Sequence, residues 1–125
     1  MKKNLKVLVV DDAKVLRITI KKILEALGHT IVAEATNGYE AIEMYKEYKP
    51  DLVTMDISMP EVNGVKDGID ALEQIIAFDK DAIVMMMTSH SEKLMVMDAI
   101  SKGSKGYALK PISQDRIVAM LDEVE

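Results

Sequence analysis

Short apolar segments alternate with amphipathic segments along the chain, and no other feature constrains the fold as strongly. Five segments are rich in apolar residues, which is typical of strands buried on both faces of a parallel sheet; they are Leu5–Val10, Thr30–Ala35, Asp51–Met55, Ala82–Met87 and Gly106–Leu109. Each is followed by a segment whose apolar residues have helical spacing; these are Val15–Leu27, the stretch from Asn37 to Tyr48, Ile69–Phe78, Glu92–Lys102 and Ser113–Val124. Strict alternation predicts an α/β fold, a doubly wound sheet of five parallel strands covered by helices on both faces.

The composition excludes several classes of function. The 125 residues suit one domain, and the lack of cysteine rules out disulfides, thiolate catalysis and cysteine-bound metals. A net charge of −5, with no run of more than two basic residues, argues against nucleic-acid binding. No apolar run approaches the roughly 18 residues of a membrane span, and Lys6 and Asp11 interrupt any signal peptide. We therefore expect a cytoplasmic protein, in which any metal is held by oxygen.

Polar residues stand where four of the expected strands end. Asp11-Asp12 follows the first strand, Asp56 the third, Thr88-Ser89 the fourth and Lys110-Pro111 the fifth. In a parallel sheet these groups meet at the carboxyl edge, where α/β proteins bind their ligands. Close carboxylates need a counter-charge, and Mg²⁺ suits one or two carboxylates together with waters and a phosphoryl group. The set therefore indicates phosphoryl transfer to an aspartate nucleophile.

These positions also carry a family resemblance over nearly the whole chain. The matching stretches are Val9-Val10-Asp11-Asp12, Asp56-Ile57-Ser58-Met59-Pro60-Glu61 with Asn63-Gly64, Thr88-Ser89 and Lys110-Pro111. The chain resembles response-regulator receiver domains of the CheY-like family. This resemblance implies a receiver domain over residues 1–125 with the flavodoxin-like (βα)5 fold, whose strand order is 2-1-3-4-5.

The resemblance implies a role for each residue of the acid cluster. Asp56 matches the aspartate that accepts the phosphoryl group. Asp12 matches the acid that binds Mg²⁺ or Mn²⁺ directly, and Asp11 the acid that usually acts through water. Ser58 matches the position whose backbone carbonyl binds the metal.

Further roles follow for the residues around the cluster. Lys110 matches the lysine that contacts the phosphoryl group, and the Lys110–Pro111 peptide bond is expected to be cis. Thr88 matches the switch hydroxyl that moves toward the phosphate. Tyr107 matches the switch aromatic residue, which changes between outward and inward rotamers.

The function implied is that of a stand-alone switch in a two-component system. A histidine kinase or phosphotransfer protein would phosphorylate Asp56, and the last two helices and the fifth strand would then change their surface for a downstream protein. We expect a monomer or weak dimer that catalyses only its own phosphorylation and dephosphorylation. The cognate kinase, the target and the choice between chemotaxis and a phosphorelay stay open.

Three other functions fit the pattern less well. A phosphohydrolase with an aspartyl nucleophile typically has a second acid two residues further on, where this chain has Ser58. A flavodoxin needs a phosphate-binding loop rich in Ser, Thr and Gly after the first strand, and a P-loop protein needs a Gly-Lys-Ser/Thr signature. Neither is present in the sequence.

Several remaining residues give more local expectations. Relative to the family, Val65–Gly68 is an insertion of four residues, and Asp67 is placed to cap the following helix, which favours a longer loop. His29 follows a helix stop at Gly28 and is expected to be exposed. Core packing is expected for Met85-Met86-Met87, and helix-face packing for Tyr39, Tyr45 and Tyr48. One residue of the Met95 and Met97 pair should face solvent.

Overall fold

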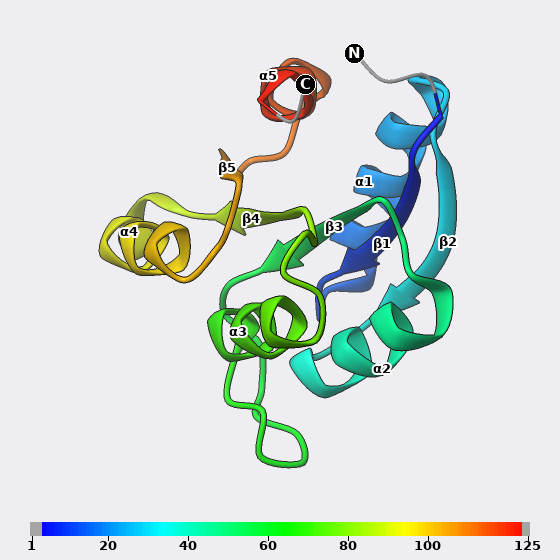
Figure 1. The fold of residues 1–125 in the computed structure, drawn as a ribbon. Helices are drawn as coiled ribbons and strands as arrows, with labels where there is room; N and C mark the ends of the chain where they lie inside the picture. Colours follow the sequence, from blue (N-terminus) through cyan, green and yellow to red (C-terminus); the bar gives the residue numbers. More distant parts are fainter. Residues whose placement is uncertain (1–3, 124–125) are drawn as a thin grey trace.

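Five parallel strands form a single sheet with the order β2-β1-β3-β4-β5 in the computed structural model (Figure 1). The structure describes residues 4–123, and at position 90 the backbone only. The strands are β1 (Lys6–Val10), β2 (Thr30–Ala35), β3 (Leu52–Asp56), β4 (Val84–Thr88) and β5 (Gly106–Leu109). The doubly wound fold and the strand order expected from the sequence are confirmed.

Helices cover both faces of this sheet, as Figure 1 shows. They are α1 (Lys14–Ala26), α2 (Gly38–Tyr48), α3 (Gly68–Phe78), the short 3-10 helix η1 (His90–Glu92), α4 (Lys93–Ser101) and α5 (Gln114–Asp122). One buried cluster joins α2, α3 and α4 to the sheet, and a second joins α1 and α5 to the opposite face. The carboxyl edge of the sheet is thereby left open for a site.

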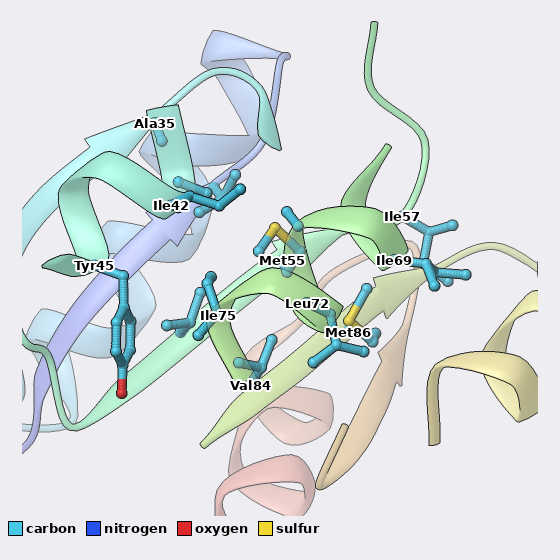
Figure 2. Close-up of a cluster of buried hydrophobic side chains, with 14 of the residues drawn as sticks. Ala35, Ile42, Tyr45, Met55, Ile57, Ile69, Leu72, Ile75, Val84 and Met86 are labelled. Atoms are coloured by element: carbon cyan, nitrogen blue, oxygen red, sulfur yellow. The ribbon is translucent and has the colours of Figure 1, made fainter. Parts of the chain in front are cut away.

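The interior strands are apolar because both of their faces are buried. Figure 2 shows the first cluster, in which Met55 and Met86 of the sheet lie against Leu72 and Ile75 of α3. Met85 and Met87 point the other way, toward Ile117 of α5 in the second cluster. All three consecutive methionines are fully buried, which confirms the expectation of core packing. Burial of each such side chain stabilises the fold by about 1.5–3 kcal/mol.

β2 and β5 have the bounds that the sequence pattern indicated and β1 begins one residue later, whereas β3 and β4 lie one or two residues further along the chain. β3 includes Asp56 and β4 includes Thr88, so both residues end their strands instead of following them. β4 begins only at Val84, because the chain first completes a turn after α3, in which the Ala82 amide donates to the Asp79 carbonyl at 3.0 Å. The last helix begins after its cap Ser113, whose side chain accepts a hydrogen bond from the Arg116 amide; the expected end at Val124 lies outside the described residues.

The four-residue insertion forms a longer loop, as predicted. Asn63 and Gly64 have φ of 50° and 83° and form a two-residue turn, for which Asn-Gly is strongly preferred. Val62 and Val65 flank the turn and exchange backbone hydrogen bonds of 3.2 and 3.0 Å. The Asp67 side chain caps α3 by accepting from the Asp70 amide at 2.9 Å.

The end of this loop is packed against the strand that carries Asp56. The Gly68 amide donates to the Ile57 carbonyl at 2.8 Å. A Cβ on Gly68 would overlap the backbone carbonyl of Asp56, so only glycine fits there without a shift. The insertion is therefore attached to the strand end at its base.

Three expectations for single residues were wrong. His29 is buried with 4% of its surface exposed, because its Nδ1 accepts a hydrogen bond from the Leu5 amide at 3.1 Å. Burial lowers the pKa of His29. Tyr39 and Tyr48 are exposed, and only Tyr45 packs into the core, where its hydroxyl donates to Asp79 Oδ2 at 2.8 Å.

Candidate functional site

Three carboxylates meet at the carboxyl edge of the sheet. Asp11 follows β1 and Asp56 ends β3, and these strands are neighbours in the sheet. Each of Asp11, Asp12 and Asp56 offers a carboxylate oxygen, and these oxygens lie within 4.8 Å of one another. Asp11 and Asp56 are buried, whereas Asp12 is exposed. The structure thus brings together the three acids that the sequence indicated.

Asp11 is fixed by hydrogen bonds on one side and left open on the other. Its Oδ1 accepts from the Ala13 amide at 2.8 Å, and its backbone carbonyl accepts from Arg17 Nη1 at 2.8 Å. Within the described residues its buried Oδ2 has no hydrogen-bond partner; Lys110 Nζ is 3.8 Å away. Burial raises the pKa of Asp11. A buried oxygen of this kind is suited to a cation.

Asp56 shares the pocket with Lys110, which directly follows β5. Lys110 Nζ donates to Asp56 Oδ1 at 3.0 Å, and the Lys110–Pro111 peptide bond is cis, as expected. Burial, together with the nearby charge of Asp11, raises the pKa of Asp56 to about 6 although Lys110 lowers it. Burial also disfavours the lysine's charge, but the bond to Asp56 outweighs this and raises the pKa of Lys110.

The donor set fits a hard divalent cation. Carboxylate oxygens are the ligands that Mg²⁺ and Mn²⁺ take in proteins. The unpartnered Oδ2 of Asp11 and the like charges of three acids both favour a bound cation. Ser58 is exposed beside this cluster, and its hydroxyl donates to Glu92 Oε2.

Thr88 ends β4 at the same edge, and its hydroxyl makes its hydrogen bonds away from the three acids. Its buried hydroxyl lies 3.3 Å from Glu92 Oε1 and 3.2 Å from the Ser89 carbonyl oxygen. Its backbone carbonyl accepts from the Lys110 amide at 2.7 Å, which joins the ends of β4 and β5.

Glu92 is the residue at this site that the sequence reasoning missed. It accepts hydrogen bonds from Ser58, Thr88 and Ser89. Burial raises its pKa, but these hydrogen bonds lower it more, so the net pKa is lowered. Ser89 and Glu92 form a capping box, a pattern of Ser followed three residues later by Glu that is readable from sequence.

Tyr107 points outward from β5, with 47% of its surface exposed. It lines an apolar groove between α4 and β5 together with Leu94, Met97 and Ile100. Met97 is exposed while Met95 is half-buried, so one of the two does face solvent, as expected.

Among the described residues, no helix has the length and apolar character needed to cross a membrane.

Known proteins share both the sequence and the fold. The family model "Response regulator receiver domain" matches residues 7–122. Chemotaxis protein CheY of Thermotoga maritima is 44% identical over 95% of this chain and 96% of its own length. Chemotaxis protein CheY of Bacillus subtilis is 45% identical over 94% of this chain and 95% of its own. A CheX-CheY-BeF3-Mg complex from Borrelia burgdorferi includes a chain with a TM-score of 0.88 and 32% identity, covering 99% of this chain and 90% of that one.

Proposed function

Because the chain belongs to the response regulator receiver domain family and is thus a phosphorylation-activated response regulator, we propose that Asp56 is its phosphoacceptor. The observation that carries the proposal is the placement of this carboxylate. It ends an interior strand, is 3% exposed, and has a lysine at 3.0 Å and two further acids beside it. A buried carboxylate among like charges is costly for stability, and such costs are concentrated at functional sites.

The reaction proposed is transfer of a phosphoryl group from a phosphohistidine. A carboxylate oxygen of Asp56 attacks phosphorus, an O–P bond forms, and the N–P bond to the donor histidine breaks with the electron pair left on nitrogen. Lys110 holds the attacking carboxylate at 3.0 Å and remains close to the charge that collects on the phosphoryl oxygens. Hydrolysis later returns the free carboxylate.

Mg²⁺ or Mn²⁺ is the proposed cofactor, held by Asp12, Asp56 and the backbone carbonyl of Ser58, with Asp11 acting through water. A bound cation neutralises phosphoryl charge in such transfers. Asp12→Ala should weaken Mg²⁺ binding strongly, because a charged ligand is lost. Asp81→Asn, which changes an exposed acid in the turn before β4, should leave it unchanged. Equal affinity of the Asp12 variant would reject this ligand assignment.

The partners proposed are a histidine kinase or phosphotransfer protein as donor and a protein target as receiver of the signal. Chemotaxis is the process we favour, since several similar proteins are chemotaxis proteins named CheY. Phosphorylation adds about −1.5 to −2 charge units. Thr88 and Lys110 would move to contact it, and Tyr107 and the α4–β5–α5 surface would change.

Acetyl phosphate and Mg²⁺ test the assignment directly. Intact-protein mass spectrometry should show one added phosphoryl group on the wild type and none on Asp56→Asn. The Asp81→Asn variant should be labelled like the wild type. Full labelling of the Asp56 variant would contradict the proposal.

A small phosphoester such as p-nitrophenyl phosphate tests the phosphohydrolase alternative. We propose that the chain catalyses only its own phosphorylation and dephosphorylation, so no multiple turnover is expected. In the position where a phosphohydrolase has its general acid, the structure has Ser58, hydrogen-bonded to Glu92. Sustained release of p-nitrophenol, lost in Asp56→Asn, would favour the enzyme.

A further inference from the structure

The carboxylate of Glu92 gathers donors from two loops that border the acid pocket. The Ser58 hydroxyl reaches it from the loop after β3. The Thr88 hydroxyl and the Ser89 amide reach it from the end of β4, at 3.3 and 2.9 Å. Glu92 therefore links the strand ends that carry the phosphoacceptor and the switch hydroxyl.

The hydrogen bond to Thr88 matters because this side chain has a single proton to donate. Thr88 is fully buried, and in the part of the chain that the structure describes its hydroxyl has Glu92 Oε1 and the Ser89 carbonyl as acceptors. The carboxylate is the stronger acceptor, because hydrogen bonds to ionised groups are about twice as strong as neutral ones. A phosphoryl group on Asp56 can accept this proton only after the hydroxyl has left Glu92.

We propose that Glu92 is a positioning residue that holds the Thr88 hydroxyl away from Asp56 in the unphosphorylated protein, and so opposes activation. This inference rests on the proposed function of Asp56 and Thr88. A ligand shifts a conformational equilibrium only by its different affinity for the two states. On activation Thr88 loses its hydrogen bond to Glu92, and the free energy of that bond is subtracted from the free energy that the new contact between Thr88 and the phosphoryl group supplies. Glu92 therefore sets how far phosphorylation shifts the equilibrium toward the active state.

Glu92 is well fixed for this role. Its bond to the Ser89 amide belongs to the capping box that begins η1, so the carboxylate does not depend on Thr88 for its position. Its charge also acts on Lys110, as one of the smaller contributions to the raised pKa of that lysine. The carboxylate thus stands at the end of β4, bonded to Thr88 and Ser89, and near enough to the pocket for its charge to act on Lys110.

The test is binding of beryllofluoride, a phosphoryl analogue, in the presence of Mg²⁺, followed by NMR. Glu92→Gln is the variant of choice, because glutamine serves in capping boxes as well as glutamate but is a weaker, neutral acceptor for Thr88. We expect the apparent affinity for beryllofluoride to rise about fivefold, the difference between a charged and a neutral acceptor. Glu61→Gln, in the exposed loop after β3, should change it by less than about twofold.

A double-mutant cycle separates this role from simple charge repulsion, since Glu92 also repels an anion through its charge. In the Thr88→Ala background there is no hydroxyl to release, so Glu92→Gln should give a smaller gain there, namely the part that loss of the charge supplies by itself. An equal gain in both backgrounds, or no gain with Thr88 present, would overturn the role of Glu92 while leaving the proposed function intact. Failure of the wild type to bind beryllofluoride would instead overturn the proposed function, and this inference with it.

Discussion

Replacement of the buried phosphoacceptor should make the metal-free protein more stable. The pKa of Asp56 is raised from its ordinary 3.8 to about 6, chiefly by burial. Each pKa unit corresponds to about 1.36 kcal/mol, so ionising this carboxylate near pH 7 costs the fold about 3 kcal/mol. Asp56→Asn removes that cost and keeps the side-chain shape, but loses the charged bond to Lys110. We expect a net gain of about 1–3 kcal/mol in the free energy of unfolding.

The pH dependence of this gain has a definite sign. A raised pKa means that the folded protein binds the proton more tightly than the unfolded chain does. Through Asp56, stability therefore falls as the pH rises from about 4 to about 6, where the wild-type carboxylate ionises. The stability gap between Asp56→Asn and the wild type should thus be widest near pH 7 and narrow toward pH 4.

Urea unfolding followed by circular dichroism, with a chelator present, measures this gap at each pH. Asp81→Asn, at an exposed aspartate, serves as the control and should change stability by less than about 0.5 kcal/mol. Addition of Mg²⁺ should stabilise the wild type more than Asp56→Asn, because a ligand of the folded state raises its stability. A destabilised Asp56 variant, or a gap that does not vary with pH, would refute the reasoning.

Four further substitutions test three other parts of the structure. Burial lowers the pKa of His29, so the wild type should lose stability as the pH falls below about 6.5. Urea unfolding should show a smaller loss in His29→Gln. The same dependence of the free energy of unfolding on pH in both proteins would contradict this expectation. Gly68→Ala, whose Cβ would overlap a backbone carbonyl, should cost about 3 kcal/mol. At Gly64 a Cβ would have space around it, but φ is positive, so Gly64→Ala should lower the free energy of unfolding by about 1 kcal/mol in the same assay. A larger loss for Gly64→Ala than for Gly68→Ala would reject the packing argument. Lys110→Ala removes the cation beside two buried acids, so an NMR titration should find that the pKa of Asp56 is higher in the variant than in the wild type. A lower pKa of Asp56 in the variant would mean that Lys110 is not the main partner of this carboxylate.

The fold and the acid cluster were predictable because their signals are local. Alternating apolar and amphipathic segments define the layers, and residues that follow parallel strands must meet at one edge. Asp11 and Asp56 therefore come together without any knowledge of side-chain packing. The Asp67 cap was equally readable, because a cap involves residues only three positions apart.

What escaped prediction depends on contacts between distant segments. His29 looks like a residue after a helix stop, and only the approach of Leu5, 24 positions away, explains its burial. Tyr45 and Tyr48 lie on one helix, but only Tyr45 meets Asp79 and the ring of Phe78 from α3. The sequence around Glu92 indicates only a helix cap. Its hydrogen bond to Ser58 was not predictable, because the two residues lie 34 positions apart in the chain.

The free energy needed for local opening differs between the strands that form the pocket, because some lie inside the sheet and one lies at its edge. β1, β3 and β4 each have a strand on both sides, whereas β5 is a four-residue edge strand that, among residues 4–123, pairs with β4 alone. Backbone amides in short edge elements exchange with solvent through cheaper fluctuations than those of a sheet's interior. Lys110 directly follows β5, while Asp11 and Asp56 belong to the ends of interior strands. We therefore expect the least costly opening of the native state to withdraw the lysine and to leave the carboxylates in place.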